Sequence, residues 1–186
     1  HPQNLGSSAS RNTGWDHATQ EFVAFLDADD SWDPNKIKIQ YIWMSRCPSA
    51  VVCGTLHVVN ERDQRLDAIP LREVPTKQFT MGDLLIKNRF STPSAMMRRN
   101  INERFDTTFR YSEDYLLWLT IASRHNFVHR IELPLTILHK KTYGQGGLSD
   151  DLVAMFRGEL HALRNLAALT SMPRSKMVLA MTWSVM

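Results

Sequence analysis

The segment Phe22-Val23-Ala24-Phe25-Leu26-Asp27-Ala28-Asp29-Asp30-Ser31-Trp32 places five apolar residues directly before three closely spaced carboxylates. This pattern predicts a buried strand whose C-terminal end carries acids, and that end is where open α/β sheets bind ligands. Carboxylates packed this closely repel one another and are costly to desolvate, so they favour a counter-charge such as a divalent cation held by oxygen ligands. We therefore expect a metal or phosphate site here.

An acidic turn that caps the next helix is the alternative interpretation. Asp33 before Pro34 has the pattern of an N-cap followed by proline at the first helical position. Capping explains Asp33 but leaves Asp27 and Asp29 unexplained. The site interpretation accounts for both of these acids.

Length and composition predict one soluble globular domain with a real core, since the chain has 186 residues of which 43% are hydrophobic. The net charge of +3 is mild and the basic residues are scattered, apart from Arg98-Arg99 and Lys140-Lys141, so we expect no nucleic-acid partner. Cys47 and Cys53 lack the spacing of a zinc site or a disulfide framework. A reducing compartment is the resulting expectation.

Helical and strand patterns alternate along the chain, which predicts an α/β fold. We expect helices within residues 7–19, 34–44, from Thr80, from Ser112 and over 149–168, and strands at 21–26, 50–53, 94–97, 127–133 and 135–139. Residues 60–78 are polar and contain Pro70 and Pro75, so they are predicted to form a surface excursion.

The C-terminal segment 175–186 is rich in apolar side chains and follows the basic residues Arg174 and Lys176. This pattern favours a helix that associates with an anionic membrane surface or with another chain. Packing back on the domain is the alternative. The apolar run is far shorter than the roughly 20 residues needed to span a bilayer.

Several short segments follow one another in a particular order: Asn4-Leu5-Gly6, Ser10-Arg11-Asn12-Thr13-Gly14, residues 25–32 with Pro34, Lys36 and Gln40, Ser94 with Arg98-Arg99, Phe105-Asp106, and residues 111–118 around Glu113-Asp114. In order and spacing they resemble the central part of family 2 glycosyltransferases. The resemblance covers about residues 4–150. A DxD triplet alone is weak evidence, but here an SRNxG segment precedes it and an ED pair follows about eighty residues later.

The resemblance implies a GT-A fold, that is, an α/β domain with a mixed, mainly parallel sheet flanked by helices. Residues 1–150 would be a partial glycosyltransferase domain and residues 151–186 a C-terminal helical extension. It further implies transfer of a sugar, with inversion, from a nucleotide-sugar donor such as a UDP-sugar to a hydroxyl of a saccharide or lipid-linked acceptor. The expected process is cell-surface or extracellular polysaccharide synthesis, in the cytoplasm at the inner face of the plasma membrane.

On the donor side, the resemblance assigns Asp27 to the ribose or the metal, and Asp29 to a Mn²⁺ or Mg²⁺ ion that bridges the diphosphate, with Asp30 nearby. Such a cation would stabilise the negative charge that develops on the departing diphosphate. Arg11 is expected near the nucleotide, with a helix-surface arginine as the alternative. His139 is a candidate metal ligand and Lys140 a candidate cation for the diphosphate, although a lone histidine is more often structural.

On the acceptor side, the resemblance makes Asp114 the general base that takes the proton from the acceptor hydroxyl, while Glu113 orients the acceptor. The alternative is that both acids merely favour the positive end of a helix. Trp32, Tyr115 and Trp118 are candidates for stacking on sugar rings. The helical spacing of Trp118 with Tyr115 favours the core for these two.

Family members normally begin with a strand carrying a PxYN-like segment and a second strand ending in Asp-Asp-Gly-Ser, and this chain contains neither. We therefore expect a truncated chain. Two rival interpretations remain. A different metal-dependent nucleotide enzyme, such as a nucleotidyltransferase, would also need acids at a strand edge, but it predicts a glycine-rich basic N-terminal loop. A binding or assembly module that lost its activity is the other.

Overall fold

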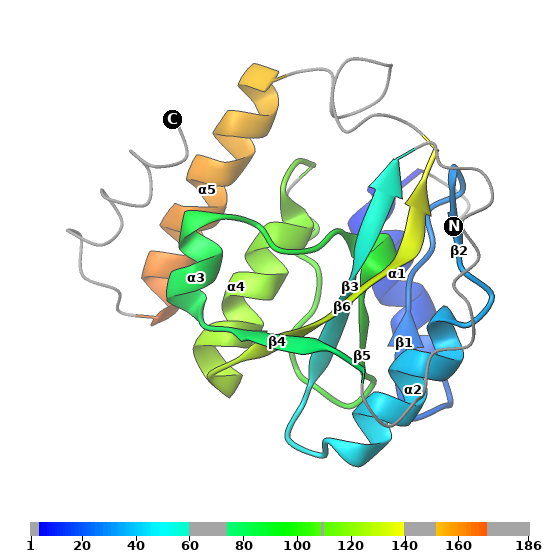
Figure 1. Cartoon of the computed structure of the whole chain (residues 1–186). Helices are drawn as coiled ribbons and strands as arrows, with labels where there is room; N and C mark the ends of the chain where they lie inside the picture. Colours follow the sequence, from blue (N-terminus) through cyan, green and yellow to red (C-terminus); the bar gives the residue numbers. More distant parts are fainter. Residues whose placement is uncertain (1–3, 60–73, 109, 140–151, 171–186) are drawn as a thin grey trace.

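The computed structural model describes residues 4–59, 74–108, 110–139 and 152–170 (Figure 1). Its α-helices are α1 (Gly6–His17), α2 (Lys36–Arg46), α3 (Met81–Ile86), α4 (Glu113–His125) and α5 (Leu152–Thr170), with a short 3₁₀ helix η1 (Thr92–Ser94). Its strands are β1 (Phe22–Ala24), β2 (Asp30–Trp32), β3 (Val52–Val59), β4 (Thr76–Phe79), β5 (Met96–Arg98) and β6 (Val128–Leu138).

The six strands form one sheet in the order β1-β5-β3-β6-β2, and β4 pairs with the first half of β6. The expected α/β fold with a mixed sheet and flanking helices is confirmed. The expectation that the sheet is mainly parallel is wrong for the described strands, because only β3 and β6 run parallel there. The three-residue strands β1, β2 and β5 all pair antiparallel, each with a strand that is distant in the sequence.

The strand structure predicted over residues 127–139 is present, and two details of the prediction differ because the strands pair with distant residues. Residues 127–133 and 135–139 form the single strand β6, which continues through Pro134. Pro134 lies between the end of the β4 pairing at Ile131 and the start of the β2 pairing at Thr136, and on the β3 side it stands opposite Leu56, where the register of the ladder shifts. A proline is tolerated at such an irregularity because no regular ladder bond is required of its missing N–H. Within the predicted surface excursion, residues 76–79 form β4; residues 60–73 lie outside the described part of the chain.

Alternating side chains of the strands divide the core into two layers. Val52 and Met97 face one side of the sheet and pack with α1, α3, α4 and α5, whereas their neighbours Cys53 and Met96 face the other side and pack with α2. This follows from the two-residue period of a strand. Both faces of the sheet are therefore covered by helices, and the site must form at an end or edge of the sheet.

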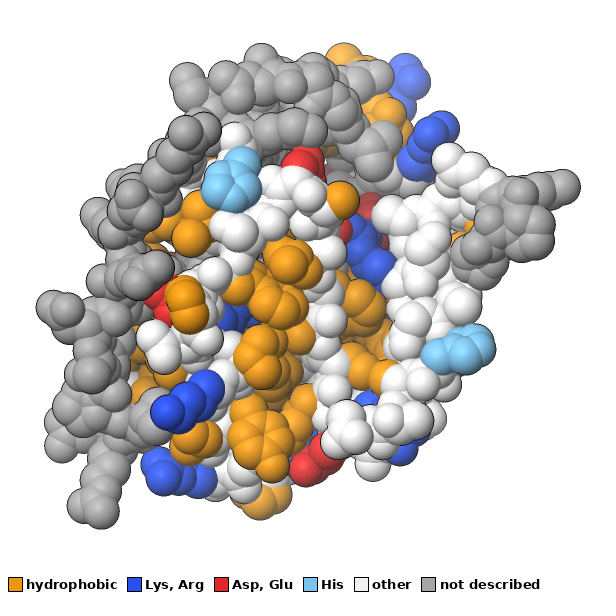
Figure 2. All heavy atoms as spheres, turned by 90° about the vertical axis from the view of Figure 1, so that its right-hand side faces the viewer, with side chains coloured by type: hydrophobic (Ala, Val, Ile, Leu, Met, Phe, Trp, Pro, Cys, Tyr) orange, Lys and Arg blue, Asp and Glu red, His pale blue; other side chains and the backbone are white. Residues whose placement is uncertain are grey.

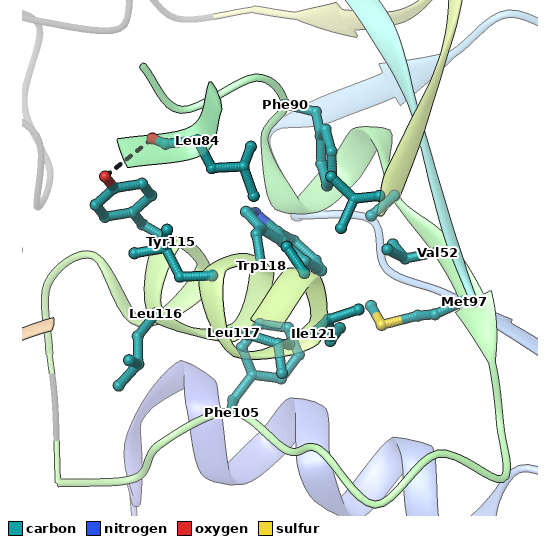
Figure 3. Close-up of a cluster of buried hydrophobic side chains, with 14 of the residues drawn as sticks. Val52, Leu84, Phe90, Met97, Phe105, Tyr115, Leu116, Leu117, Trp118 and Ile121 are labelled. Carbon is teal, nitrogen blue, oxygen red and sulfur yellow. Dashed lines mark hydrogen bonds between the residues drawn. The ribbon is translucent and has the colours of Figure 1, made fainter. Parts of the chain in front are cut away.

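Helix α4 is the centre of the larger core (Figure 3). Trp118 is fully buried there and packs against Phe90 and Phe105, while the Tyr115 hydroxyl donates a hydrogen bond to the carbonyl of Leu84. The expectation that these two aromatic residues belong to the core is confirmed. Because the buried aromatic residues of α4 anchor the helix in the core, they also fix the position of its first turn, which carries Glu113 and Asp114.

A glycine lets the segment before η1 approach the sheet. A Cβ at Gly54 in β3 would stand 2.5 Å from the ring of Phe90, so only glycine fits at this close contact. Phe90 in turn packs on Trp118. The chain that leads into η1 is therefore clamped between β3 and α4.

Helix α5 agrees with the long helix predicted over residues 149–168, and its Ala162, Leu163 and Leu166 pack in the core around α4. The division of the chain at residue 150 stays a prediction. The predicted tail helix over residues 175–186 lies outside the described residues. Among the described helices, none combines the length and the apolar character that a membrane span requires.

Candidate active site

The acidic segment forms a turn between the two edge strands of the sheet. Strand β1 ends at Ala24, and the N–H of Asp30 donates to the carbonyl of Asp27 at 3.1 Å, which closes a turn that leads into β2. The predicted buried strand reaching to Leu26 is wrong: β1 is an edge strand, and Leu26 is 47% exposed. Within β1 only Val23 is buried, while Phe22 and Ala24 are partly exposed.

The capping alternative for Asp33 is only partly right. Helix α2 begins at Lys36, and its N-cap position is Asn35. Asp33 is buried and accepts a hydrogen bond from the backbone N–H of Asn35 at 2.8 Å. It therefore orders the entry to α2 and takes no part in the acidic turn.

Arg11 joins the donor-side acids to the acceptor-side acids. Its guanidinium lies 2.8 Å from Asp27 Oδ1 and 2.9 Å from Glu113 Oε1, and its side chain is only 16% exposed. Burial would lower the pKa of Arg11, but the charges of Asp27 and Glu113 outweigh it and hold that pKa above its ordinary value. The alternative of a free helix-surface arginine does not fit these contacts.

Asn12, the next residue of the same motif, explains why α1 holds this position. Its side-chain amide donates to the carbonyl of Phe105 at 2.8 Å and accepts from the N–H of Phe105 at 3.0 Å. The Phe105 ring lies 5.4 Å from the Arg11 guanidinium. Helix α1 is thus pinned to the segment that leads to α4, and Arg11 is held between the two acidic motifs.

Asp114 stands beside this bridge at the start of α4. Its Oδ1 accepts a hydrogen bond from the N–H of Tyr115 at 2.7 Å, and its Oδ2 accepts one from the Thr92 hydroxyl at 3.3 Å. Burial and the neighbouring charge of Glu113 raise the pKa of Asp114 to about 6, against the opposing effect of the N–H, Arg11 and Thr92. A carboxylate with a pKa near 6 is ionised at neutral pH and is a better proton acceptor than an ordinary aspartate.

The helix-start alternative accounts for one contact of Asp114, the hydrogen bond from the Tyr115 N–H, but for no contact of Glu113. Ser112 before them makes no side-chain cap, and its φ is 58°, in the left-handed region. Glu113 instead accepts hydrogen bonds from Arg11 and from the Ser7 hydroxyl, both on α1. The first turn of α4 therefore presents its acids towards other elements rather than towards its own backbone alone.

The acidic turn is the place where the Mn²⁺ or Mg²⁺ site is expected. No group of three or more His, Cys, Asp or Glu side chains is placed to hold a metal ion among the described residues. Burial together with the charges of Asp29 and Asp27 raises the pKa of Asp30, so negative charge is concentrated here. Magnesium is commonly held by one or two carboxylates plus the phosphates of the substrate. The donor chemistry of the turn therefore fits such a cation, without a complete protein cage.

His139 lies next to the acidic turn, at the end of β6. Its Nε2 is 2.8 Å from the Ser31 hydroxyl, and a hydrogen bond to its backbone, more than its side chain, acts to lower the pKa of Asp30 against the effect of burial. The antiparallel pairing of Asp30 with Leu138 brings these residues together. The role of His139 as a metal ligand stays a prediction. Lys140 lies outside the described residues.

Trp32 is half-buried, and its indole is engaged at its N–H and by a lysine over the ring, while its role in stacking on sugar rings stays a prediction. Its Nε1 donates to the carbonyl of Pro93 at 2.7 Å, and the buried amine of Lys36 lies 4.2 Å from its ring centroid. This contact connects the segment after the acidic turn to η1, next to Thr92. Sequence reasoning missed both Thr92 and Ser7, because no periodicity or motif separates them from the other hydroxyl residues of the chain.

A groove of about 680 Å³ runs along the outer edge of the sheet, between α1 and β1. Arg11, Trp15, Phe22 and Phe25 are among its lining residues. Figure 2 shows hydrophobic side chains gathered in a band on one side of the molecule. The groove shares Arg11 with the acidic site but does not include Asp29 or Asp114, so we place the chemistry at the acids and not in the groove.

Comparison with known proteins relates this geometry to a family. The model of "Glycosyl transferase family 2" matches residues 1–105. The chain is 29% identical over 121 residues to the Escherichia coli protein "UDP-Glc:alpha-D-GlcNAc-diphosphoundecaprenol beta-1,3-glucosyltransferase WfgD", covering 65% of this chain and 46% of that protein. It is 30% identical over 125 residues to "Amylovoran biosynthesis glycosyltransferase AmsE" of Erwinia amylovora, with the same coverage of 65% and 46%. The chain thus spans about half the length of these curated relatives.

Solved structures agree on the fold. The crystal structure of S. aureus TarS 1-349 in complex with UDP-GlcNAc superposes with a TM-score of 0.64 at 14% identity, covering 95% of this chain and 51% of TarS 1-349. The complex of the same protein with UDP gives a TM-score of 0.55 at 14% identity, covering 95% of this chain and 49% of the other. At this identity the likeness shows a shared GT-A-like α/β fold. Because the family match covers more than half of the chain, and includes both Arg11 and Asp27 of the bridge, this chain belongs to glycosyl transferase family 2.

Proposed function

We propose that this chain forms part of an inverting glycosyltransferase that moves a sugar from a UDP-sugar to a hydroxyl of a saccharide or lipid-linked acceptor. The observation that carries the proposal is the Arg11 bridge. It draws together Asp27 and Glu113, which are far apart in sequence, and leaves Asp114 beside them. An enzyme of this kind needs donor-side and acceptor-side acids at one place, and the bridge supplies that arrangement.

In the proposed reaction, the acceptor hydroxyl oxygen attacks the anomeric carbon of the donor sugar. A new carbon–oxygen bond forms while the bond between that carbon and the diphosphate breaks, and UDP leaves with the bonding electron pair. The hydroxyl proton passes to the Asp114 carboxylate, whose pKa of about 6 leaves it ionised at neutral pH. Attack from the face opposite to UDP inverts the anomeric centre.

Asp29 and Asp30, with His139 at the edge of the turn, are the residues that would hold a Mn²⁺ or Mg²⁺ ion. When bound, such an ion neutralises charge on the departing diphosphate. Asp27 is engaged through Oδ1 by Arg11, so its remaining oxygen is the one available for the ribose or the metal. Glu113, held by Arg11 and Ser7, is proposed to orient the acceptor.

The names of WfgD and AmsE support an acceptor in polysaccharide synthesis, and the TarS complexes support UDP as the nucleotide of the donor. We propose the same chemistry for a chain extended to the length of these relatives, called the longer protein below. A cytoplasmic location at the inner face of the plasma membrane remains part of the proposal. The two cysteines are free thiols, which fits a reducing compartment.

Calorimetric titration of the folded chain with UDP, with and without Mn²⁺, tests the proposal. We expect UDP to bind and Mn²⁺ to strengthen the binding. A sugar-transfer assay on the longer protein then distinguishes the rival enzyme class, because a nucleotidyltransferase would release pyrophosphate from a nucleoside triphosphate and no UDP from a UDP-sugar. A folded sample that binds no nucleotide would instead favour the non-catalytic binding module.

A further inference from the structure

The 3₁₀ helix η1 occupies a special place, between the segment after the acidic turn and the start of α4. Thr92, Pro93 and Ser94 are all buried, with exposures of 4% or less for Thr92 and Ser94. The Thr92 hydroxyl donates to Asp114 Oδ2. The helix η1 thus contacts the candidate base although it belongs to neither acidic motif.

Two side chains from the other side of the site hold η1 at its backbone. Trp32 of β2 donates from Nε1 to the carbonyl of Pro93 at 2.7 Å, and Gln40 of α2 donates from Nε2 to the carbonyl of Ser94 at 3.0 Å. The same Gln40 amide reaches the carbonyl of Cys53 in β3 at 2.7 Å. The 3₁₀ helix η1 is therefore fixed both to the sheet and to the segment that follows Asp30.

A buried lysine completes this clamp. Lys36 is fully buried, its Nζ donates to Gln40 Oε1 at 2.7 Å, and it lies over the Trp32 ring. Lys36 thereby orients both side chains that hold η1: it fixes which end of the Gln40 amide points at Ser94, and it packs on the indole. Hydrogen bonds in such a buried network reinforce one another and restrict each member to one orientation.

We infer that Thr92 is a positioning residue for Asp114, and that Trp32 and Gln40 set the position of Thr92. The inference deepens the proposed function, because it concerns the carboxylate named there as the base. With the N–H of Tyr115 on Oδ1 and Thr92 on Oδ2, both oxygens of Asp114 have a fixed donor. The plane of the Asp114 carboxyl group is then fixed relative to an incoming hydroxyl. Its orientation depends on the segment that follows the donor-side acids, because that segment holds η1.

The Thr92 hydroxyl donates to Asp114 and so favours its ionised form, in the same sense as Arg11 and the Tyr115 N–H and against burial and Glu113. Replacing Thr92 by valine keeps the branched shape and removes the hydroxyl, so the pKa of Asp114 should rise by roughly 0.5 to 1 unit. Thr92→Ser keeps the hydroxyl and should restore the parental pKa. Thr120→Val serves as the control, because it removes a buried hydroxyl of α4 that donates to the Leu116 carbonyl. It should leave the pKa of Asp114 unchanged.

The pKa of Asp114 can be measured in the full chain from the ¹³C shift of its carboxyl group as a function of pH, assigned with Asp114→Asn. An unchanged pKa in Thr92→Val, or a Thr120→Val variant that moves it equally, would overturn the inference. Trp32→Phe removes the bond to Pro93 and should move the pKa in the same direction by a smaller amount, because Gln40 still holds Ser94. No change in that variant would overturn the role of Trp32.

The acid limb of the pH–rate profile, measured for sugar transfer by the longer protein, separates this inference from the proposed function. If the acid limb shifts with the carboxyl pKa in Thr92→Val and has its parental position in Thr92→Ser, the result supports both the role of Thr92 and the assignment of Asp114 as the base. If the carboxyl pKa shifts but the limb stays, Thr92 still positions Asp114 and the base assignment fails.

Discussion

The two acidic regions of this site are built in opposite ways. Asp114 stands at the start of a helix whose body is the centre of the core, and each of its oxygens accepts a hydrogen bond. Asp29 lies on a turn between two three-residue edge strands and is exposed. In both regions burial is the largest cause that raises a carboxyl pKa and neighbouring carboxylates add to it, namely Glu113 for Asp114 and Asp29 with Asp27 for Asp30.

The difference teaches which region can do which chemistry. A base must be held in one orientation and kept from bulk water, which a core-anchored helix start provides. Acids that meet a cation and a diphosphate need access and concentrated negative charge, which an exposed turn provides. Arg11 is the shared element, since it neutralises one acid of each region.

Removing the base should have the largest effect. Asp114→Asn keeps the shape of the side chain but cannot accept the hydroxyl proton, so sugar transfer by the longer protein should fall on the order of 10²-fold or more. UDP affinity should stay nearly parental, because the change acts on the acceptor side. Steady-state transfer rates with UDP titrations check both, and Asp16→Asn, an exposed acid paired with Arg104, is the matched control. Transfer at the parental rate would refute the base assignment.

The same substitution should stabilise the folded chain at neutral pH. Because the pKa of Asp114 is about 6 when folded against an ordinary value of 3.8, the folded state keeps its proton over a range where the unfolded chain has lost it. Stability therefore falls as pH rises from about 4 to 6, and Asp114 costs stability at pH 7. The expected gain in Asp114→Asn is on the order of 1 to 3 kcal/mol at pH 7.

Urea unfolding of both forms at pH 7 and near pH 4 measures this gain. The difference should shrink towards pH 4, where the parental carboxyl is protonated in the folded state and about half protonated in the unfolded chain. An Asp114→Asn variant that is less stable than its parent at pH 7 would show that the carboxylate stabilises the fold through its hydrogen bonds, contrary to our expectation.

A weaker effect is expected on the exposed side of the comparison. Asp29→Ala should reduce Mn²⁺-dependent UDP affinity about tenfold or more, which is about 1.4 kcal/mol, and leave the melting temperature without ligand unchanged. Asp16→Ala serves as the control for loss of an exposed acid. If the Mn²⁺-dependent affinity is parental, Asp29 holds no cation; if the ligand-free protein melts much earlier, its role is structural.

The smallest effect concerns the bridge between the two regions. A double-mutant cycle with Arg11→Gln and Glu113→Gln should give a coupling energy of about 1 kcal/mol, since the pair is close but not fully buried. The corresponding cycle for the more exposed pair Arg104 and Asp16 should give less, within the range of surface ion pairs. Equal couplings measured by urea unfolding would mean that the bridge is an ordinary surface contact.

Several elements were predictable from the sequence because their signals are local. The short helix α3 starts with the capping box of Thr80 and Asp83, and both of its hydrogen bonds are present. Helices α1, α2, α4 and α5 lie where the apolar spacing predicted them, within a few residues. The two acidic motifs and their order along the chain could also be read directly from the sequence.

The sheet was less predictable because its pairings join distant residues. Nothing local indicates that residues 30–32 pair with 136–138, or that β1 lies at the edge of the sheet rather than inside it. A run of apolar residues predicts burial only when partners cover it on both sides, and the apolar run before Asp27 lacks such cover among the described residues.

By itself, the sequence determined the family, the α/β class and the two acidic motifs, since each depends on residue types at fixed spacing. Tertiary structure alone decided how these motifs meet: Arg11 reaches both because α1 is pinned to Phe105, and Asp114 gains its donor from η1 because Trp32 and Gln40 hold that turn. The pKa of Asp114 also depends on this assembly, because it is set by burial and by charges that only the fold brings near.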